Sequence, residues 1–397
     1  MSVGAKKKIL YVEPFFWSGG PHNVLVNITK SLNLNEYEPH IVVPGKIGDI
    51  NDSEIDDIPT KGLSFLHNVG RKGGIFHMSI AVIKSCIGAI QVAHYVKKHS
   101  IDVIHTNNET CLSGSIGGWL ARRPNVVHVH GLGFSDSWAA GIVASILNIT
   151  ADRVIAVSKV VHEALLTHGV EESKIRVVAN GIDTDKFTPE IICEDISMEF
   201  NLSNDYFTVG MIGGLEPRKG HELFLRAASE VLSEVHNVRF FVIGGGIPGD
   251  VRQSRFYQSQ IFSLTQDLGI EDSVVFTGHR SDIEGFLSVL DIVVQPSNTE
   301  AAPLVPLEAM SSGTPVIATD VGGNSEEVVH DETGILVPAN DHFALTKAII
   351  DILRSESLRE RLGKSGRVRV LKHFSVDVMG LKIQRIYAEL QVEQVSK

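Results

Sequence analysis

The chain has 397 residues, of which 43% are hydrophobic and 21% are charged, a composition that is typical of globular proteins and excludes a fibrous or disordered chain. At roughly 150 residues per domain, this length predicts two or three domains. The formal net charge of −11 argues against general binding to nucleic-acid phosphates, which requires clustered lysine and arginine. The charge is uneven, because residues 1–180 contain 17 basic and 15 acidic side chains, whereas residues 181–397 contain 19 and 32.

Cysteine usage and hydropathy predict the compartment. Cys86, Cys111 and Cys193 are odd in number and far apart, so they offer neither a disulfide framework nor a zinc cluster. No apolar stretch reaches the roughly 20 residues that span a bilayer, and Glu13 and Pro14 interrupt the first apolar run before a signal-peptide core could form. We therefore expect a soluble cytoplasmic protein.

Short β-branched runs alternate with longer amphipathic segments through the first 180 residues. This alternation predicts a mostly parallel sheet with helices on both faces. The expected strands are Ile9–Val12, Ile41–Val43, Val103–His105, Val126–Val129, Val154–Val157 and Ile175–Val178, and the expected helices are Val24–Leu34, Ile80–His99 and Val160–His168.

The alternation stops in the polar segment 180–204, which we interpret as a linker, and then starts again. The expected strands are Phe207–Ile212, Phe240–Ile243, Val274–Phe276, Ile292–Val294 and Val316–Ala318, and the expected helices are Glu222–Ser233, Phe256–Leu268, Pro306–Met310, Phe343–Leu353, Ser357–Lys372 and Val376–Val392.

The predicted fold class is therefore α/β, with two doubly wound, Rossmann-like domains at residues 1–180 and 181–375. A final helical segment, residues 376–397, is expected to return towards the first domain. Sheets of this kind bind ligands at the carboxyl ends of their strands, so two such domains facing each other would form a ligand-binding cleft.

Three glycine-containing loops follow predicted strands. Gly19 and Gly20 lie just before the first helix, where free N–H groups favour an anion, although a glycine pair alone also fits a tight turn. The segment Glu216–Gly220 places Arg218 and Lys219 at a strand end beside a helix N-terminus, a combination that suits a diphosphate. The loop Gly244–Gly246 has no lysine after it, so an ordinary turn is favoured there.

Two glutamates eight residues apart form the strongest motif. Glu300 follows a predicted strand and Glu308 lies in the next helix, with no other polar side chain between Ala301 and Leu307. Carboxylates in this setting can accept hydrogen bonds from pairs of sugar hydroxyls, while the backbone N–H groups of Leu304 and Val305 face phosphate oxygens.

The sequence here resembles the E-x7-E signature of retaining glycosyltransferases of family 4, the group 1 transferases with a GT-B fold. The signature continues from Glu308 to Gly323, and the segments Glu216–Gly220, Lys174–Asp183 and Gly19–Gly20 are similar to the family's other landmarks in the same order. The resemblance covers nearly the whole chain.

The resemblance implies a role for each matching residue. Arg218 and Lys219 would bind the diphosphate of a nucleotide-sugar donor, and Glu308 the ribose. Glu300 would bind hydroxyls of the transferred sugar, and Gly19 and Gly20 would approach the diphosphate. The catalytic set is then Glu300, His130, Arg218 and Lys219.

The resemblance also assigns a role to a histidine. His130 matches a histidine that contacts the donor sugar in relatives, but His128 lies on the same face of the strand, so either could reach the ligand.

Two motifs could indicate a metal. A His-x-His pair without a third ligand fits a structural pair better than a metal site. Asp183 and Asp185 spell D-x-D, but they lie in the predicted linker, so we expect no metal and no cofactor other than the donor substrate.

One departure from the family concerns the sugar pocket. Ala301 stands where the family usually has glycine, so the identity of the donor sugar is not carried over. The predicted activity is metal-independent, retaining transfer of a sugar to a glycan, lipid-linked or small-molecule acceptor bound by the first domain. No carboxylate of that domain is an evident nucleophile. The alternatives are a nucleotide-sugar epimerase or hydrolase and a non-catalytic nucleotide-sugar-binding protein; an NAD-dependent oxidoreductase would need a G-x-G-x-x-G loop that is missing.

The acceptor is not predicted by any motif. Residues 70–85 form a glycine-rich, basic loop that includes Arg71 and Lys72 and leads into an apolar helix. This loop either contacts an anionic membrane or a lipid-linked acceptor peripherally, or is solvated.

Overall fold

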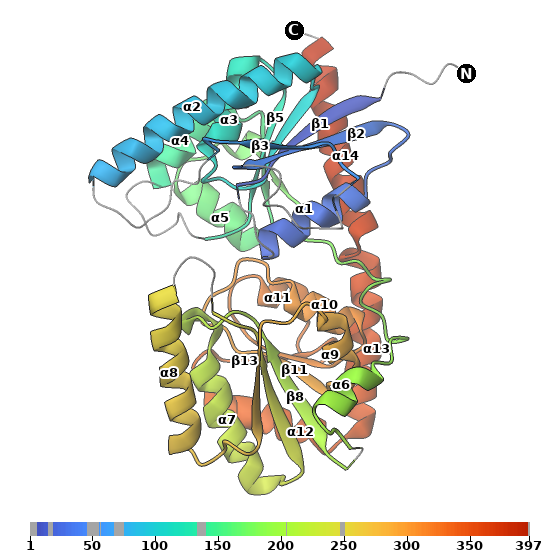
Figure 1. The fold of residues 1–397 in the computed structure, drawn as a ribbon. Helices are drawn as coiled ribbons and strands as arrows, with labels where there is room; N and C mark the ends of the chain where they lie inside the picture. The colour runs from blue at the N-terminus through green and yellow to red at the C-terminus, as the bar shows by residue number, and fades with distance from the viewer. Residues whose placement is uncertain are drawn as a thin grey trace. The chain divides into compact units, whose positions relative to one another are not determined.

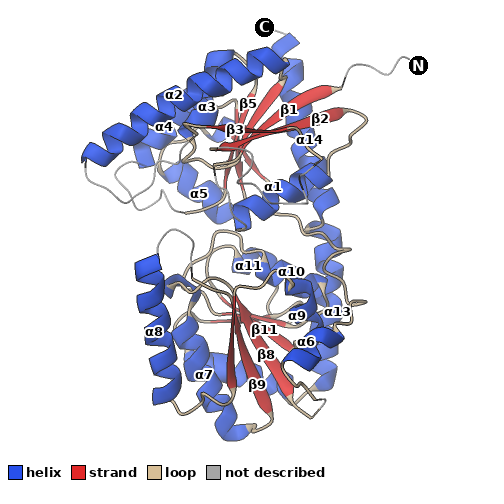
Figure 2. Ribbon diagram, viewed as in Figure 1, coloured by secondary structure: helices blue, strands red, loops and turns tan. Residues whose placement is uncertain are grey.

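The computed structural model describes residues 6–14, 19–45, 55, 57–66, 75–132, 140–203, 205–246 and 251–395. The chain divides into two compact units, one of residues 1–181 together with 376–397 and one of residues 182–375. Each unit contains one parallel sheet covered by helices (Figures 1 and 2). Within the described ranges, every helix is too short or too polar to cross a membrane.

The first unit contains a seven-stranded sheet in the order β3-β2-β1-β4-β5-β6-β7. Helices α2 to α5 cover one face of this sheet, and α1 and α14 cover the other (Figure 1). The strands are β1 Lys7–Val12, β2 Tyr37–Pro44, β3 Thr60–Leu63, β4 Val103–Thr106, β5 Asn125–Val129, β6 Arg153–Ala156 and β7 Ile175–Val177. The helices are α1 Gly20–Lys30, α2 Ile75–His99, α3 Leu112–Ala121, α4 Ala140–Thr150, α5 Lys159–Thr167 and α14 Val376–Val395.

All strands and helices predicted for this unit are present, but β3, α3 and α4 were missed. Helix α3 reads LSGSIGGWLA, and three glycines in ten residues argue against a helix by propensity. Close packing explains them: a Cβ at Gly114 would lie 2.4 Å from Oγ1 of Thr106, and one at Gly117 would lie 2.7 Å from Cβ of Val92. Tertiary contact with β4 and α2 therefore outweighs the poor propensity.

The second unit contains a six-stranded sheet in the order β10-β9-β8-β11-β12-β13. Its strands are β8 Phe207–Ile212, β9 Val238–Ile243, β10 Val274–Gly278, β11 Ile292–Gln295, β12 Val316–Thr319 and β13 Ile335–Val337. Its helices are α6 Glu194–Glu199, α7 His221–Glu234, α8 Val251–Asp267, α9 Ile283–Val289, α10 Val305–Ser311, α11 Asn324–Glu327, α12 His342–Leu353 and α13 Glu356–His373.

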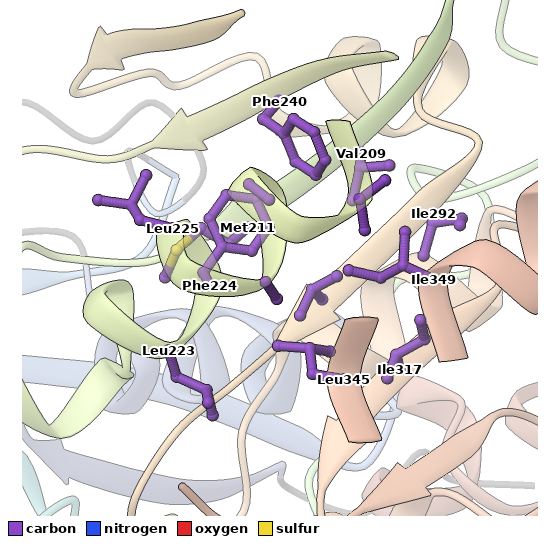
Figure 3. Packing of buried hydrophobic residues seen from close by; sticks show 14 of the residues in the cluster. Val209, Met211, Leu223, Phe224, Leu225, Phe240, Ile292, Ile317, Leu345 and Ile349 are labelled. Carbon is purple, nitrogen blue, oxygen red and sulfur yellow. The ribbon is translucent and has the colours of Figure 1, made fainter. Parts of the chain in front are cut away.

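The core of this unit lies between the sheet and helices α7 and α12. Phe224 and Leu225 of α7 pack with Leu345 and Ile349 of α12 over the apolar residues of β8, β9 and β11 (Figure 3). At about 25 cal/mol per Å² of apolar surface, burial of one such side chain contributes about 2 kcal/mol. This rigid core fixes the strand ends from which the candidate site projects.

The polar segment 180–204 was predicted to be a linker, but it also contains regular structure. It contains helix α6, whose Ile196 is buried. Ile196 and Cys193 pack onto α9, where a Cβ on Gly285 would lie 2.9 Å from the Ile196 side chain. The two apolar residues of this helix, Ile196 and Met198, are two positions apart and give no helical period, so the sequence pattern did not predict the helix. Strand β13 and helices α9 and α11 were also missed, and all three are short.

Candidate functional site

The carboxyl end of the second sheet brings three of the predicted site residues together. Lys219 Nζ donates to Glu300 Oε1 at 2.6 Å, and Arg218 Nη1 lies 3.6 Å from Glu300 Oε2. Gln295 and Ser297 also donate to Glu300 Oε1, at 3.0 and 2.8 Å. A buried carboxylate is thus fixed by one cation and two neutral donors, while the exposed guanidinium of Arg218 also pairs with Glu216.

The loop before α7 holds the two cations in place through glycine. Gly220 has φ +76°, and a Cβ there would lie 1.9 Å from the carbonyl oxygen of Pro296. The backbone N–H of Asn298 donates to the Arg218 carbonyl at 2.8 Å. The loops after β8 and β11 therefore pack backbone to backbone, which places Lys219 beside Glu300.

Helix α10 carries the second glutamate of the motif. Glu308 is 8% exposed, and no side chain in the described ranges forms a hydrogen bond or salt bridge with its carboxyl group. Burial raises the pKa of Glu308 to about 7, Lys186 opposes this shift and Glu284 adds to it. Leu304 and Val305 lie at the start of α10, where the N–H groups of the first turn have no partner within the helix.

The other motifs of this unit have structural explanations. Gly244 has φ +146°, and a Cβ there would lie 1.9 Å from the Gly213 carbonyl oxygen, so its glycine permits close loop packing. Asp183 Oδ1 accepts from the backbone N–H groups of Asp185 and Lys186 and thereby fixes a turn. The described residues contain no group of three or more histidine, cysteine, aspartate or glutamate side chains placed to bind a metal ion.

The first unit places Gly19 and Gly20 at the start of α1, immediately after β1. A Cβ at either glycine would meet no described atom within 4 Å, and Gly19 has extended backbone. The backbone therefore does not demand glycine at position 19. The neighbouring Trp17 and Ser18, the loop residues 70–74 and Gly249 lie outside the described residues.

His130 lies at the same edge, just after β5. Its Nε2 is 2.9 Å from Asn107 Oδ1, and Asn107 Nδ2 donates to Glu13 Oε2 at 2.5 Å and to the Pro21 carbonyl at 2.9 Å. Burial lowers the pKa of His130 to about 3, so the ring is neutral at pH 7. The ring of His128 stacks on that of His130 with centroids 4.2 Å apart.

His128 belongs to a buried network that reaches the C-terminal helix. His128 Nδ1 is 3.2 Å from His105 Nε2, His105 Nδ1 is 2.6 Å from the Tyr387 hydroxyl, and Tyr387 donates to Tyr11 at 3.2 Å. All four side chains are fully buried. Of the two predicted histidines, His130 is therefore the one that is partly exposed at the sheet edge.

Sequence reasoning missed three residues at this edge. Glu13 follows β1, and Asn107 and Glu109 follow β4. The Glu109 carboxyl group accepts the backbone N–H of His130, and burial raises its pKa to about 7. These contacts do not test the prediction that no carboxylate of this domain is an evident nucleophile, which stays a prediction. The carboxyl ends of parallel strands meet at one edge of a sheet. The position of all three residues just after predicted strands could therefore have indicated that they lie close together.

Two family models match the chain. The model described as "Glycosyl transferases group 1" matches residues 194–369, and the model described as "Glycosyltransferase Family 4" matches residues 18–186. Together they cover most of both units.

Curated relatives and solved structures agree with these matches. The chain is 28% identical over 329 residues to the UDP-Gal:alpha-D-GlcNAc-diphosphoundecaprenol alpha-1,3-galactosyltransferase of Escherichia coli, covering 80% of this chain and 82% of that protein. It is 28% identical to the capsular polysaccharide biosynthesis glycosyltransferase CapM of Staphylococcus aureus, covering 72% and 76%. HepE from Anabaena in complex with UDP and glucose has a similar fold, with a TM-score of 0.80 at 22% identity and coverage of 96% and 99%. Sucrose-phosphate synthase from Thermosynechococcus elongatus also gives 0.80, at 25% identity and coverage of 98% and 100%.

Proposed function

Because the chain belongs to the group 1 glycosyltransferases, enzymes with the GT-B fold, we propose that it transfers a sugar from a nucleoside diphosphate sugar to an acceptor hydroxyl with retention of anomeric configuration. The second unit binds the donor, and the first unit binds the acceptor. The alternatives of an epimerase, a hydrolase or a non-catalytic binding protein are not favoured by relatives that are named as transferases.

The observation that carries this proposal is the contact of Lys219 and Arg218 with Glu300 at the end of β8 and β11. Two cations at a strand end can hold a diphosphate and stabilise the negative charge that develops as it leaves. The orientation of Glu300 is fixed by three donors. Its carboxylate can accept hydrogen bonds from hydroxyl groups of the transferred sugar. In this proposal Glu308 accepts hydrogen bonds from the ribose.

The proposed step exchanges one bond to the anomeric carbon for another on the same face of the sugar. The bond from this carbon to the β-phosphate oxygen breaks, and the acceptor oxygen forms the new bond through an oxocarbenium-like transition state. The acceptor proton passes to the departing phosphate. Arg218 and Lys219 supply the charge stabilisation that a metal ion supplies in other transferases, so we propose that the reaction is metal-independent.

The names of similar proteins narrow the first substrates to test. HepE was crystallised with UDP, and the Escherichia coli relative is named for UDP-galactose and a lipid-linked acceptor. We therefore propose a uridine diphosphate sugar as donor and a polyprenyl-diphosphate-linked sugar as acceptor class. The apolar side chains of Val82, Ile83 and Ile90 on α2 are exposed and fit peripheral contact with a membrane that carries such an acceptor.

The first test is a thermal-shift panel of nucleotides and nucleotide sugars, because a ligand that binds the folded protein raises its midpoint. Product analysis by mass spectrometry with the stabilising donor then separates transfer from hydrolysis and epimerisation. We expect a glycosylated acceptor and free nucleoside diphosphate. Formation of free sugar alone, or an epimerised donor, would contradict the proposal. Flotation with anionic vesicles tests membrane contact, and a protein that stays at the bottom of the gradient would exclude it.

A further inference from the structure

The side chain of Asn107 is fixed by its neighbours in one orientation. Its Nδ2 lies 2.5 Å from Glu13 Oε2 and 2.9 Å from the Pro21 carbonyl oxygen. Both of these groups are acceptors, so both hydrogens of the amide are used. A flipped amide would place its oxygen against two other oxygens. The Asn107 oxygen must therefore face His130.

This orientation determines where His130 carries its proton. Asn107 Oδ1 can only accept a hydrogen bond, and it lies 2.9 Å from His130 Nε2, so Nε2 must carry a hydrogen. The ring is neutral, because its burial lowers the pKa of His130 to about 3. A neutral ring with a proton on Nε2 has a lone pair on Nδ1. No side chain or backbone group in the described ranges bonds to Nδ1 of His130.

The groups around His130 preserve this state. Glu13 acts through Asn107, and Glu109 faces the backbone N–H of His130. His128 stacks on the ring and is itself kept neutral by burial, which together with His105 and His130 lowers its pKa. Glu13 and Asn107 are 1% and 0% exposed, so water does not compete for these bonds.

We propose that Glu13 and Asn107 are positioning residues that hold His130 in the Nε2-protonated tautomer, so that His130 meets its substrate only as a hydrogen-bond acceptor for a hydroxyl group. The inference rests on the proposed function in one respect, namely that this hydroxyl belongs to a glycosyl substrate. In this state His130 neither donates a proton nor interacts as a cation with the leaving diphosphate.

The tautomer can be observed without any substrate. Nitrogen-15 NMR of the full-length protein with labelled histidine distinguishes a protonated from a bare ring nitrogen, and the His130→Gln variant identifies the His130 signals. We expect a protonated Nε2, a bare Nδ1 and no titration between pH 5 and 8. A proton on Nδ1, or a ring that titrates in this range, would overturn the inference even if the protein proves to be a glycosyltransferase.

Adjacent asparagines provide a matched pair of variants. Asn107→Ala removes the anchor of the ring, whereas Asn108→Ala removes an amide whose partner within the described ranges is Thr110 alone. We expect Asn107→Ala to lose the fixed tautomer in the NMR spectrum and to lower kcat/KM about 10- to 100-fold through misorientation. Asn108→Ala should keep both. Equal spectra and equal rates for the two variants would refute a positioning role.

A carboxylate at position 107 gives a readout that loss of stability cannot mimic. In Asn107→Asp the new charge favours protonated His130, so Nδ1 gains a proton. The pH profile of kcat at saturating donor, which does not depend on donor affinity, then gains an acid limb that the wild type lacks. When Glu13→Gln is added to Asn107→Asp, the amide of residue 13 can donate a hydrogen bond to the carboxylate of residue 107. This double variant should recover activity at pH values above the acid limb. If Asn107→Asp is folded and active but its pH profile has no acid limb, the inference fails. A fixed His130 tautomer in a protein that transfers no sugar would refute only the proposed function.

Discussion

The carboxyl edges of the two sheets differ in how they hold their functional groups. At the edge of the second sheet, Glu300 is bound by Lys219 at 2.6 Å and approached by Arg218. At the edge of the first sheet, His130 is held by the neutral amide of Asn107 and has a pKa near 3. One edge is built from ion pairs and the other around a neutral ring.

This difference corresponds to the chemistry that each edge would meet. A diphosphate requires positive charge, which the second unit supplies locally although residues 181–397 are the more acidic part of the chain. A hydroxyl group can also be bound by an oriented, uncharged acceptor, which the first unit supplies in His130 held by Asn107. The net charge of the second unit therefore does not argue against the proposed binding of a charged donor there, because field strength depends on the groups within a few ångströms.

Removal of the central cation should have the largest effect on this contrast. Lys219→Ala is expected to lower kcat/KM about 10²- to 10³-fold, because a preorganised charge aimed at the leaving group is lost. Glu300→Ala and Arg218→Ala should also lower turnover with the fold intact. Lys364→Ala, which removes an exposed lysine paired with Glu360, is the control. Near-wild-type transfer by all three site variants would refute the assignment.

Substitution of Gly220, which lets the two loops at the charged edge pack together, should have the next largest effect on stability and nucleotide binding. Gly220→Ala must displace the Pro296 carbonyl, which would lie 1.9 Å from the new Cβ, whereas Gly269 has φ +64° and open space. Gly269→Ala should cost about 1 kcal/mol and lower the thermal midpoint by about 2–4 °C. We expect at least twice that shift for Gly220→Ala, with weaker nucleotide binding. Equal midpoints for the two variants would contradict the packing argument.

The buried Glu308 predicts a pH-dependent affinity for the donor. Its pKa of about 7 means that the carboxyl group is largely protonated at pH 6 and ionised at pH 8. Hydroxyl donors bind the ionised form more strongly, so affinity should rise with pH through this window and binding should release a proton, with a limit of about tenfold per pH unit. A nucleotide sugar is the appropriate ligand, because its phosphates do not titrate there. Calorimetry should find no such slope for Glu308→Gln.

The same group should affect stability in the opposite direction. The folded pKa of Glu308 lies above the ordinary value of 4.5, so the folded state holds the extra proton between about pH 4.5 and 7. Its contribution to stability is therefore present at low pH and is lost as the pH rises through 7. Glu308→Gln should remove this loss, and a thermal midpoint with the same pH dependence in both proteins would contradict the raised pKa.

The sequence predicted what depends on local pattern. β-Branched runs identified the buried strands. Arg218 and Lys219 stood out at a strand end beside a helix N-terminus, and Glu300 and Glu308 stood out because the segment between them is apolar. The three glycines of α3 concealed a helix that only its packing against α2 and β4 explains. Glu13 and Asn107 carry no motif, since they lie 94 residues apart and meet only through the pairing of β1 with β4. Their importance follows from strand order, which residue pattern does not specify.

The smallest expected effect tests how the C-terminal helix supports the neutral edge. Tyr387 of α14 donates to Tyr11, so its oxygen accepts the Nδ1 hydrogen of His105. Tyr387→Phe leaves this buried hydrogen without a partner, which should cost about 1 kcal/mol of stability. Because His105 contacts His128 and not His130, turnover should fall less than twofold. Thermal unfolding and kcat/KM measured on one preparation test both statements. A large loss of turnover at unchanged stability would show that the fixed ring at the edge depends on the whole chain of histidines, and that Asn107 alone does not hold it.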